Sequence, residues 1–98
     1  MKSKILVIGS SGSLGKQIIN TLKYFNHKIF FGINRKNVDV VKNFEKLEKI
    51  VLKFKPSHIV NCVAMTGLLQ CETESNLAYK VNTIFPLKLG NICRKKQI

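Results

Sequence analysis

Three glycines near the start of the chain carry the clearest chemical signal in the sequence. They lie in the stretch Gly9-Ser10-Ser11-Gly12-Ser13-Leu14-Gly15, with two residues between successive glycines. Glycines let a backbone turn tightly and approach a pyrophosphate without a Cβ in the way, and a helix that begins there offers free N–H groups and its positive dipole end. The last glycine allows a helix to pack closely on the preceding strand. The stretch therefore predicts a dinucleotide site, the alternative being a flexible Gly/Ser turn.

The residues that follow the second apolar run bear on which dinucleotide would bind. Folds that select NAD commonly place Asp or Glu there to bind the ribose 2′-hydroxyl. This chain has Asn34, Arg35 and Lys36 instead, and a cation at this position suits a 2′-phosphate. We therefore expect NADP as the cofactor, with NAD as an open alternative. The alternative to a phosphate-binding role is that Arg35 and Lys36 form a solvated turn in a lysine-rich protein.

The other nucleophilic and titratable residues form no pattern that indicates catalysis or metal binding. His27 and His58 border predicted strands, without Ser, Cys or Asp at a spacing typical of a proton relay. Cys62, Cys71 and Cys93 are an odd number with no close pair, which argues against a disulfide framework or a zinc site. Free thiols in a reducing cytoplasm are the simplest interpretation. We predict no catalytic residue and no metal ligand in this chain.

The elements that must position the glycine stretch alternate between strand and helix. Near-continuous apolar runs predict buried strands at 4–8, 28–33 and 58–63. Apolar positions at helical spacing predict helices over 14–25, over 44–54 and from Asn76 onward, the last bent at Pro86. Residues 65–75 are expected to be a loop or a broken helix. The alternation predicts an α/β, Rossmann-like NAD(P)-binding fold with a parallel sheet of three main strands and helices on both faces.

Size, charge and hydropathy narrow the class of protein. With 98 residues and 45% hydrophobic content the chain is expected to form one small globular domain, and its apolar runs are too short to span a bilayer. Its net charge of +12 would suit a nucleic acid. However, only Arg35 and Arg94 are arginine and the lysines are dispersed, whereas surfaces that read bases favour the planar guanidinium. We therefore expect neither a nucleic-acid nor a membrane partner.

Further segments sharpen the interpretation of the glycine stretch through a resemblance. The third strand is followed by Asn61-Cys62-Val63-Ala64-Met65-Thr66, and Glu72 precedes Leu77-Ala78-Tyr79-Lys80-Val81-Asn82. Together with the glycine spacing, this succession resembles the extended short-chain dehydrogenase/reductases. Within them it is most similar to the dTDP-4-dehydrorhamnose reductases and related sugar-nucleotide reductases. The resemblance covers essentially the whole chain.

The resemblance implies a role for each matching position. In that family the glycine loop holds the pyrophosphate, an acidic residue followed by an aliphatic one contacts the adenine, and the segment after the third strand runs along the nicotinamide ribose. Asp39 could instead be a helix N-cap or turn residue, and Asn82 matches an asparagine whose role is partly structural. The expected cofactor-binding residues are Gly9, Ser11, Gly12, Ser13, Leu14, Gly15, Asn34, Arg35, Asp39, Val40, Cys62, Val63, Ala64, Thr66 and Asn82.

The resemblance also shows what the chain lacks. The family's hydride chemistry uses a Ser or Thr after the next strand and a Tyr-x-x-x-Lys pair on the next helix. Tyr24 and Lys28 have that spacing but straddle the end of a helix and the start of a strand, so we interpret it as coincidence. We expect residues 1–98 to be a partial N-terminal NAD(P)-binding domain without the C-terminal substrate domain, truncated and inactive alone.

Two functions remain open at this stage. The first is the cofactor-binding portion of a cytoplasmic, NADPH-dependent reductase of a 4-keto sugar nucleotide, which would bind the sugar nucleotide only in a full-length form. The second is a non-catalytic nucleotide-binding or regulatory module of the same fold. In either case the outer edge of the 58–63 strand would lack a partner, so we expect self-association there.

Overall fold

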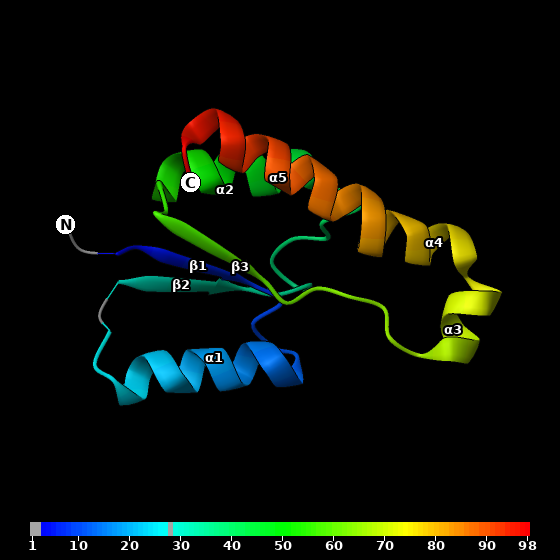
Figure 1. The fold of residues 1–98 in the computed structure, drawn as a ribbon, viewed down its shortest axis with the longest axis horizontal. Helices are drawn as coiled ribbons and strands as arrows, with labels where there is room; N and C mark the ends of the chain where they lie inside the picture. The colour runs from blue at the N-terminus through cyan, green and yellow to red at the C-terminus, as the bar shows by residue number, and fades with distance from the viewer. Residues whose placement is uncertain (1–2, 28) are drawn as a thin grey trace.

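A three-stranded parallel sheet lies between two layers of helices in the computed structural model, which describes residues 3–27 and 29–98 (Figure 1). The strands are β1 (Ile5–Ile8), β2 (Phe30–Ile33) and β3 (His58–Asn61), in the order β2-β1-β3. In the register Val7 of β1 stands opposite Gly32 of β2 and Val60 of β3. The predicted parallel sheet is confirmed, and the predicted strand start at Lys28 lies outside the described residues.

Helices cover both faces of this sheet, as predicted. Helix α1 (Ser13–Tyr24) lies on one face, and α2 (Phe44–Phe54) and α5 (Phe85–Lys96) lie on the other (Figure 1). The amphipathic pattern of 44–54 coincides with the observed bounds of α2, which ends before Pro56 because proline cannot continue a helix. Lys55 takes a left-handed conformation between them, with φ of 53°.

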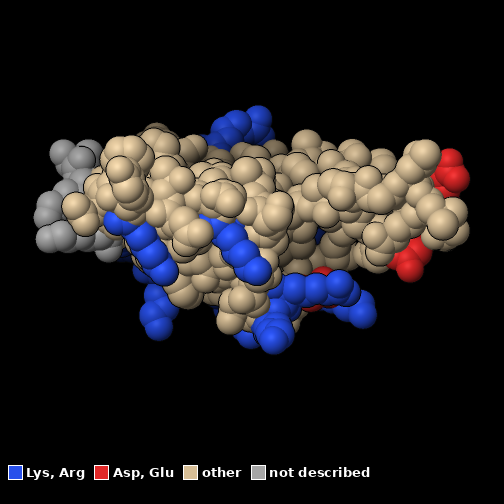
Figure 2. Space-filling model, turned by 90° about the horizontal axis from the view of Figure 1, so that it is seen from below, with Lys and Arg blue, Asp and Glu red and all other residues tan. Residues whose placement is uncertain are grey.

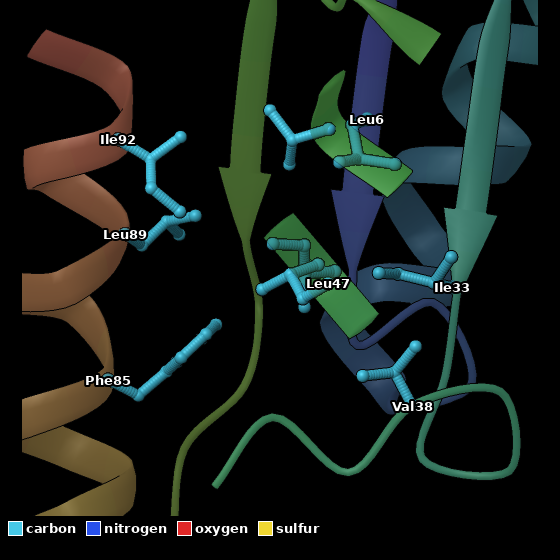
Figure 3. Close-up of a cluster of buried hydrophobic side chains, with 9 residues drawn as sticks. Leu6, Ile33, Val38, Leu47, Phe85, Leu89 and Ile92 are labelled. Carbon is cyan, nitrogen blue, oxygen red and sulfur yellow. The ribbon is translucent and has the colours of Figure 1, made fainter. Parts of the chain in front are cut away.

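The main core lies between the sheet and the α2–α5 layer. Phe85 and Leu89 of α5 and Leu47 of α2 point toward Leu6 and Ile33 of the sheet (Figure 3). Phe85 is 1% exposed, and its ring meets that of Phe44 edge-on with centroids 6.0 Å apart. This core holds the carboxyl ends of the strands in place, and the loops that form the cleft described below start from those ends.

The segment after β3 takes the form of a broken helix, one of the two alternatives expected for it. Residues 65–75, expected to be a loop or broken helix, contain α3 (Leu68–Thr73), and α4 (Ser75–Tyr79) starts at the end of this segment. The predicted strand to Val63 ends earlier, at Asn61, whose side-chain Oδ1 accepts the N–H of Val63 at 3.0 Å and so turns the chain.

The last predicted helix is interrupted one turn before Pro86. A π-helical turn, η1 (Lys80–Ile84), joins α4 to α5, and the N–H of Phe85 donates to the carbonyl of Lys80, five residues back. Pro86 has no N–H for the carbonyl of Asn82 and its ring crowds that carbonyl, so the regular α-helical pattern cannot run through this point. The expected bend at Pro86 thus takes the form of a widened turn.

Within the described residues, no helix is both long enough and apolar enough to cross a membrane. The same residues contain no group of three or more His, Cys, Asp or Glu side chains placed to hold a metal ion.

Candidate functional site

A cleft of about 540 Å³ opens at the carboxyl ends of the three strands. This is the edge at which open α/β sheets bind ligands. Most of the residues predicted from the sequence lie around it: Gly9, Ser11, Gly12, Asn34, Arg35, Asp39, Val40, Cys62, Val63 and Ala64. Ser13, Leu14, Gly15, Thr66 and Asn82 do not line it.

Two of the three loop glycines are required by the fold itself. Gly9 has φ of +85°, and a Cβ on it would lie 3.0 Å from the carbonyl carbon of Cys62. A Cβ on Gly15 would lie 2.1 Å from the carbonyl oxygen of Gly9, so α1 could not pack against the loop. The N–H groups of Gly9 and Ser10 both donate to the carbonyl of Ile33, at 2.9 and 3.0 Å, and tie the loop to β2.

Gly12 differs from its neighbours because nothing in the fold requires it to be glycine. Its φ of −73° and ψ of 171° are open to any residue. The nearest atom to a Cβ built there is the Gly9 carbonyl oxygen, at an ordinary contact distance of 3.6 Å. The missing side chain therefore leaves space on the cleft side of the loop, which is what close approach of a backbone to a pyrophosphate needs.

The first turn of α1 has no internal partner for its N–H groups. Gly12 is the N-cap residue without a side-chain cap, and the turn holds no acidic residue. The first intrahelical bond runs from the N–H of Lys16 to the carbonyl of Gly12, at 2.9 Å. Among the described residues, the N–H groups of Ser13, Leu14 and Gly15 have no acceptor. These three residues thus fit an anion through their backbone, although their side chains lie outside the cleft.

The turn after β2 places one cation at the cleft. Arg35 lines the cleft beside Asn34, whereas Lys36 does not. Both cations are exposed. Of the two positive charges that suggested a 2′-phosphate, only Arg35 is therefore in position to meet a ligand in the cleft.

Asp39 lies at the cleft and also holds the turn that follows it. It lines the cleft, and its Oδ1 also accepts the N–H groups of Val41 at 3.0 Å and Lys42 at 2.9 Å. The hydrogen bond from the Lys42 backbone is the main cause that lowers the pKa of the Asp39 carboxyl. Asp39 is thus a turn residue held as a carboxylate next to the apolar side chains of Val38 and Val40.

The opposite wall is formed by the segment after β3. Cys62, Val63, Ala64 and Met65 line the cleft, and burial raises the pKa of the Cys62 thiol, which disfavours a thiolate there. Asn82, in η1, does not line the cleft but holds this wall in position. Its Nδ2 donates to the carbonyl of Met65 and its Oδ1 accepts the Met65 N–H, both at 2.9 Å. The structural role expected for Asn82 is what the structure shows.

Sequence reasoning missed part of the lining. The additional residues are Ile8, Ile33, Val38, Val41, Met65, Gln70, Glu74, Leu77 and Val81. The first four belong to or adjoin predicted elements, and the placement of ligands at strand ends could have indicated them. Gln70, Glu74 and Leu77 come from the α3–α4 segment. Leu77 lies in the helix predicted from Asn76 onward, whereas the sequence offers no helical periodicity that would place Gln70 and Glu74 at the cleft.

The charged side chains are unevenly distributed over the surface. Seen from the α1 side, Lys and Arg side chains are spread over the part of the surface away from α3, whereas acidic side chains lie at the α3 end and, partly hidden by basic ones, near the middle of the lower edge (Figure 2). A protein with a net charge of +12 attracts anionic ligands over a distance of about 10 Å at moderate ionic strength.

The tyrosine of the coincidental Tyr-x-x-x-Lys string lies away from the cleft. Tyr24 is the last residue of α1 and is 79% exposed. It stands at the far end of the helix from the glycine loop (Figure 1). It therefore has no part in the site at the strand ends.

A parallel sheet with this strand order, a glycine loop leading into a helix, and a cleft at the strand ends together define a Rossmann-type dinucleotide-binding fold. The family model described as "RmlD substrate binding domain" matches residues 2–98. The chain belongs to that family.

Similar proteins agree with this assignment. The chain is 29% identical over its whole length to a dTDP-4-keto-6-deoxy-D-glucose reductase of Streptomyces niveus, of which it covers 33%. It superposes with a TM-score of 0.88 and 27% identity on dTDP-4-dehydrorhamnose reductase of Bacillus anthracis in complex with NADP, covering 99% of this chain and 34% of that one. UDP-glucose 4-epimerase of Thermus thermophilus, complexed with NAD, shares the fold with a TM-score of 0.83 and 21% identity, over 97% of this chain and 35% of that one. The chain thus spans about a third of the length of these proteins.

Proposed function

We propose that the chain is the dinucleotide-binding portion of a sugar-nucleotide reductase that uses NADPH to reduce a 4-keto sugar nucleotide. The sugar-nucleotide-reductase-like fold is given by the family and its relatives. The observation that carries the proposal is the space beside Gly12, bordered by the free N–H groups of Ser13, Leu14 and Gly15. The residues fit a pyrophosphate, because the fold does not need that space and the N–H groups need an acceptor.

Each part of the cofactor would meet a different group of residues in the cleft. The pyrophosphate would bind the backbone N–H groups at the start of α1, and the adenine would lie against Val40 beside Asp39. Arg35 would meet the 2′-phosphate, and the Cys62–Ala64 segment would run along the nicotinamide ribose. The NADP bound by the Bacillus anthracis reductase supports this choice.

When bound, the dinucleotide supplies the hydride for reduction of a ketone. The residues of this chain bind and orient it: the α1 N-terminus neutralises the diphosphate, and Asn82 holds Met65 so that the wall of the cleft keeps its shape. The chain contains no serine or threonine followed by a helical Tyr-x-x-x-Lys pair, so none of its residues is assigned the proton transfer.

Isothermal titration of the chain with NADP and with NAD tests the cofactor assignment. We expect tighter binding of NADP, and we expect Arg35→Ala to remove the preference because the guanidinium provides charge-assisted hydrogen bonds to phosphate. Arg94→Ala is the matched control, since Arg94 is the only other arginine and lies in the last turn of α5. Equal affinity for both cofactors, or tighter binding of NAD, would refute the NADP preference.

The alternative function is a non-catalytic nucleotide-binding or regulatory module. It would use the same cleft as the reductase, so the cleft does not distinguish the two functions. The coding sequence downstream of codon 98 distinguishes the two, since a continuation that encodes Tyr-x-x-x-Lys supports the reductase.

The partners we propose follow from the same fold. The sugar nucleotide would bind only to a longer form that carries a substrate domain. Among the described residues β3 pairs with β1 alone, so its outer edge is open to a second copy of the chain. The three free cysteines are compatible with the cytoplasm, where we place this activity.

A further inference from the structure

The turn after β2 is held by two asparagines that bond to each other's backbone. The Oδ1 of Asn34 accepts the N–H groups of Lys36 at 2.9 Å and Asn37 at 3.3 Å. In return, the Oδ1 of Asn37 accepts the N–H of Asn34 at 3.0 Å. The carbonyl of Asn34 also accepts the N–H groups of Asn37 at 3.0 Å and Val38 at 3.1 Å. We refer to this arrangement of Asn34 and Asn37 as the asparagine lock.

The lock has the hydrogen-bond pattern of a helix capping box, in which residues three apart satisfy each other's backbone N–H. Here no helix follows, because 34–37 form a turn and α2 begins only at Phe44. The pattern therefore serves to fix the turn. The turn directly follows β2 and is followed by Val38, whose side chain is 4% exposed and belongs to the main core.

Of the two residues between the locking asparagines, Arg35 lines the cleft and Lys36 does not. Arg35 lines the cleft but is exposed, so its long side chain has no burial to hold it. Its backbone direction is set by the bonds on either side of it, through Asn34 and Asn37. A guanidinium that starts from a fixed backbone loses less conformational entropy on binding a phosphate than one on a loose turn.

The lock also determines which atom Asn34 can offer a ligand. The oxygen is the only acceptor of an asparagine side chain, so it is the oxygen of Asn34 that must face the N–H groups of Lys36 and Asn37. The remaining group of the amide is its NH₂, which is a donor only. Asn34 and Arg35 thus present donors at the position where NAD-selective folds place an accepting carboxylate.

From this geometry we infer that Asn37 is a positioning residue for NADP selectivity: by locking Asn34 and the turn, it directs Arg35 and the Asn34 amide as donors toward the 2′-phosphate. Asn37 itself does not line the cleft and acts only through its neighbours. This inference rests on the proposed function, because it concerns the same cofactor site.

The test compares the affinities of the full chain and its variants for NADP and for NAD. Asn37→Ala removes the side-chain acceptor, and we expect NADP affinity to fall about tenfold, the equivalent of one weakened charge-assisted hydrogen bond. NAD affinity should change less than about twofold, because the lost contact serves only the 2′-phosphate. Asn37→Gln keeps an amide acceptor of the kind that capping boxes use at this position, and it should restore NADP binding to within about twofold.

Asn43→Ala is the matched control. Asn43 is also an exposed asparagine, precedes α2 and makes no side-chain capping bond, so its removal should leave the ratio of the two affinities unchanged. An equal loss of both cofactors in Asn37→Ala, an unchanged ratio, or failure of Asn37→Gln to restore it would overturn the inference and leave the proposed function intact. Failure of the wild-type chain to bind either cofactor would refute the proposed function, and the role of Asn37 with it.

Discussion

Replacing Gly12 by serine is expected to stabilise the fold while it weakens cofactor binding. Gly12 is the N-cap of α1 and has the extended backbone that N-cap residues adopt, with φ of −73° and ψ of 171°. A new Cβ meets nothing closer than 3.6 Å. Serine at an N-cap gains a few tenths of a kcal/mol over glycine, and its stiffer backbone adds roughly 0.4–1 kcal/mol through the unfolded state. The sum of about 1 kcal/mol corresponds to a rise in Tm of roughly 4–8 °C for a domain of this size.

The same substitution should obstruct the pyrophosphate. The serine hydroxyl would accept an N–H of Leu14 or Gly15, groups that have no acceptor in the described structure and that we assign to the phosphates. Loss of one charge-assisted hydrogen bond costs about 1.5–3 kcal/mol, which is roughly a 10- to 150-fold loss of affinity for NADP and for NAD.

Thermal unfolding and calorimetric titration of the same samples measure both effects. Gly67→Ser is the matched control, because Gly67 is the N-cap of α3, has φ of −71°, and a Cβ there meets only Gln70, at 3.5 Å. Gly67→Ser should leave the stability unchanged or raise it. It should keep the cofactor affinity within about twofold of the wild-type value, since it takes no N–H group away from the phosphates. A Gly12→Ser chain that binds NADP like the wild type would refute the assignment of Gly12 to the ligand. A clear fall in Tm would refute the claim that the fold does not need glycine there.

Four further outcomes are expected. Gly15→Ala should destabilise the fold by about 3 kcal/mol in chemical denaturation, because its Cβ would lie 2.1 Å from the Gly9 carbonyl oxygen; a change below about 1 kcal/mol would contradict this. Asp39→Ala should lower the free energy of unfolding by about 1 kcal/mol at pH 7. Since the folded-state pKa of this carboxyl is below its ordinary 3.8, the stabilisation is complete above that value and the difference from wild type should vanish as the pH falls through the folded-state pKa. The chain alone should not turn over NADPH with any 4-keto sugar nucleotide, and ketone-dependent oxidation that survives repurification would overturn this. Light scattering over a concentration series should show self-association through β3, whereas a monomer at all concentrations would argue against an open edge.

The parts of the fold that could be predicted from the sequence are those whose signal is local. The bounds of α2 are predicted correctly from its apolar residues at helical spacing and from Pro56, which ends the helix. Both signals lie within the same few residues. The three strands could be predicted because each contains a short run of apolar residues, although only β1 is almost wholly buried. The site after β1 follows from the glycine spacing for the same reason.

Helix α3 and the π-helical turn could not be predicted in this way. Leu68 and Leu69 are 78% and 73% exposed, so α3 buries no apolar stripe that a periodicity could reveal. The widened turn at Lys80–Ile84 depends on Pro86 and on Asn82, whose partner Met65 lies 17 residues away. A contact across that separation is a property of the folded chain and leaves no local pattern.

The three loop glycines show most clearly where sequence reasoning stops. The glycine spacing predicts a tight turn, close approach of a pyrophosphate and, for Gly15, close packing of the helix, but it does not divide the first two roles between Gly9 and Gly12. The structure separates them: Gly9 is needed for its positive φ, Gly15 for close packing of the helix, and Gly12 for neither. A glycine that the fold does not use carries a cost, because serine at the same N-cap would stabilise the helix. That unused stability, beside N–H groups that have no acceptor among the described residues, is the main physical argument for the phosphate site proposed at this loop.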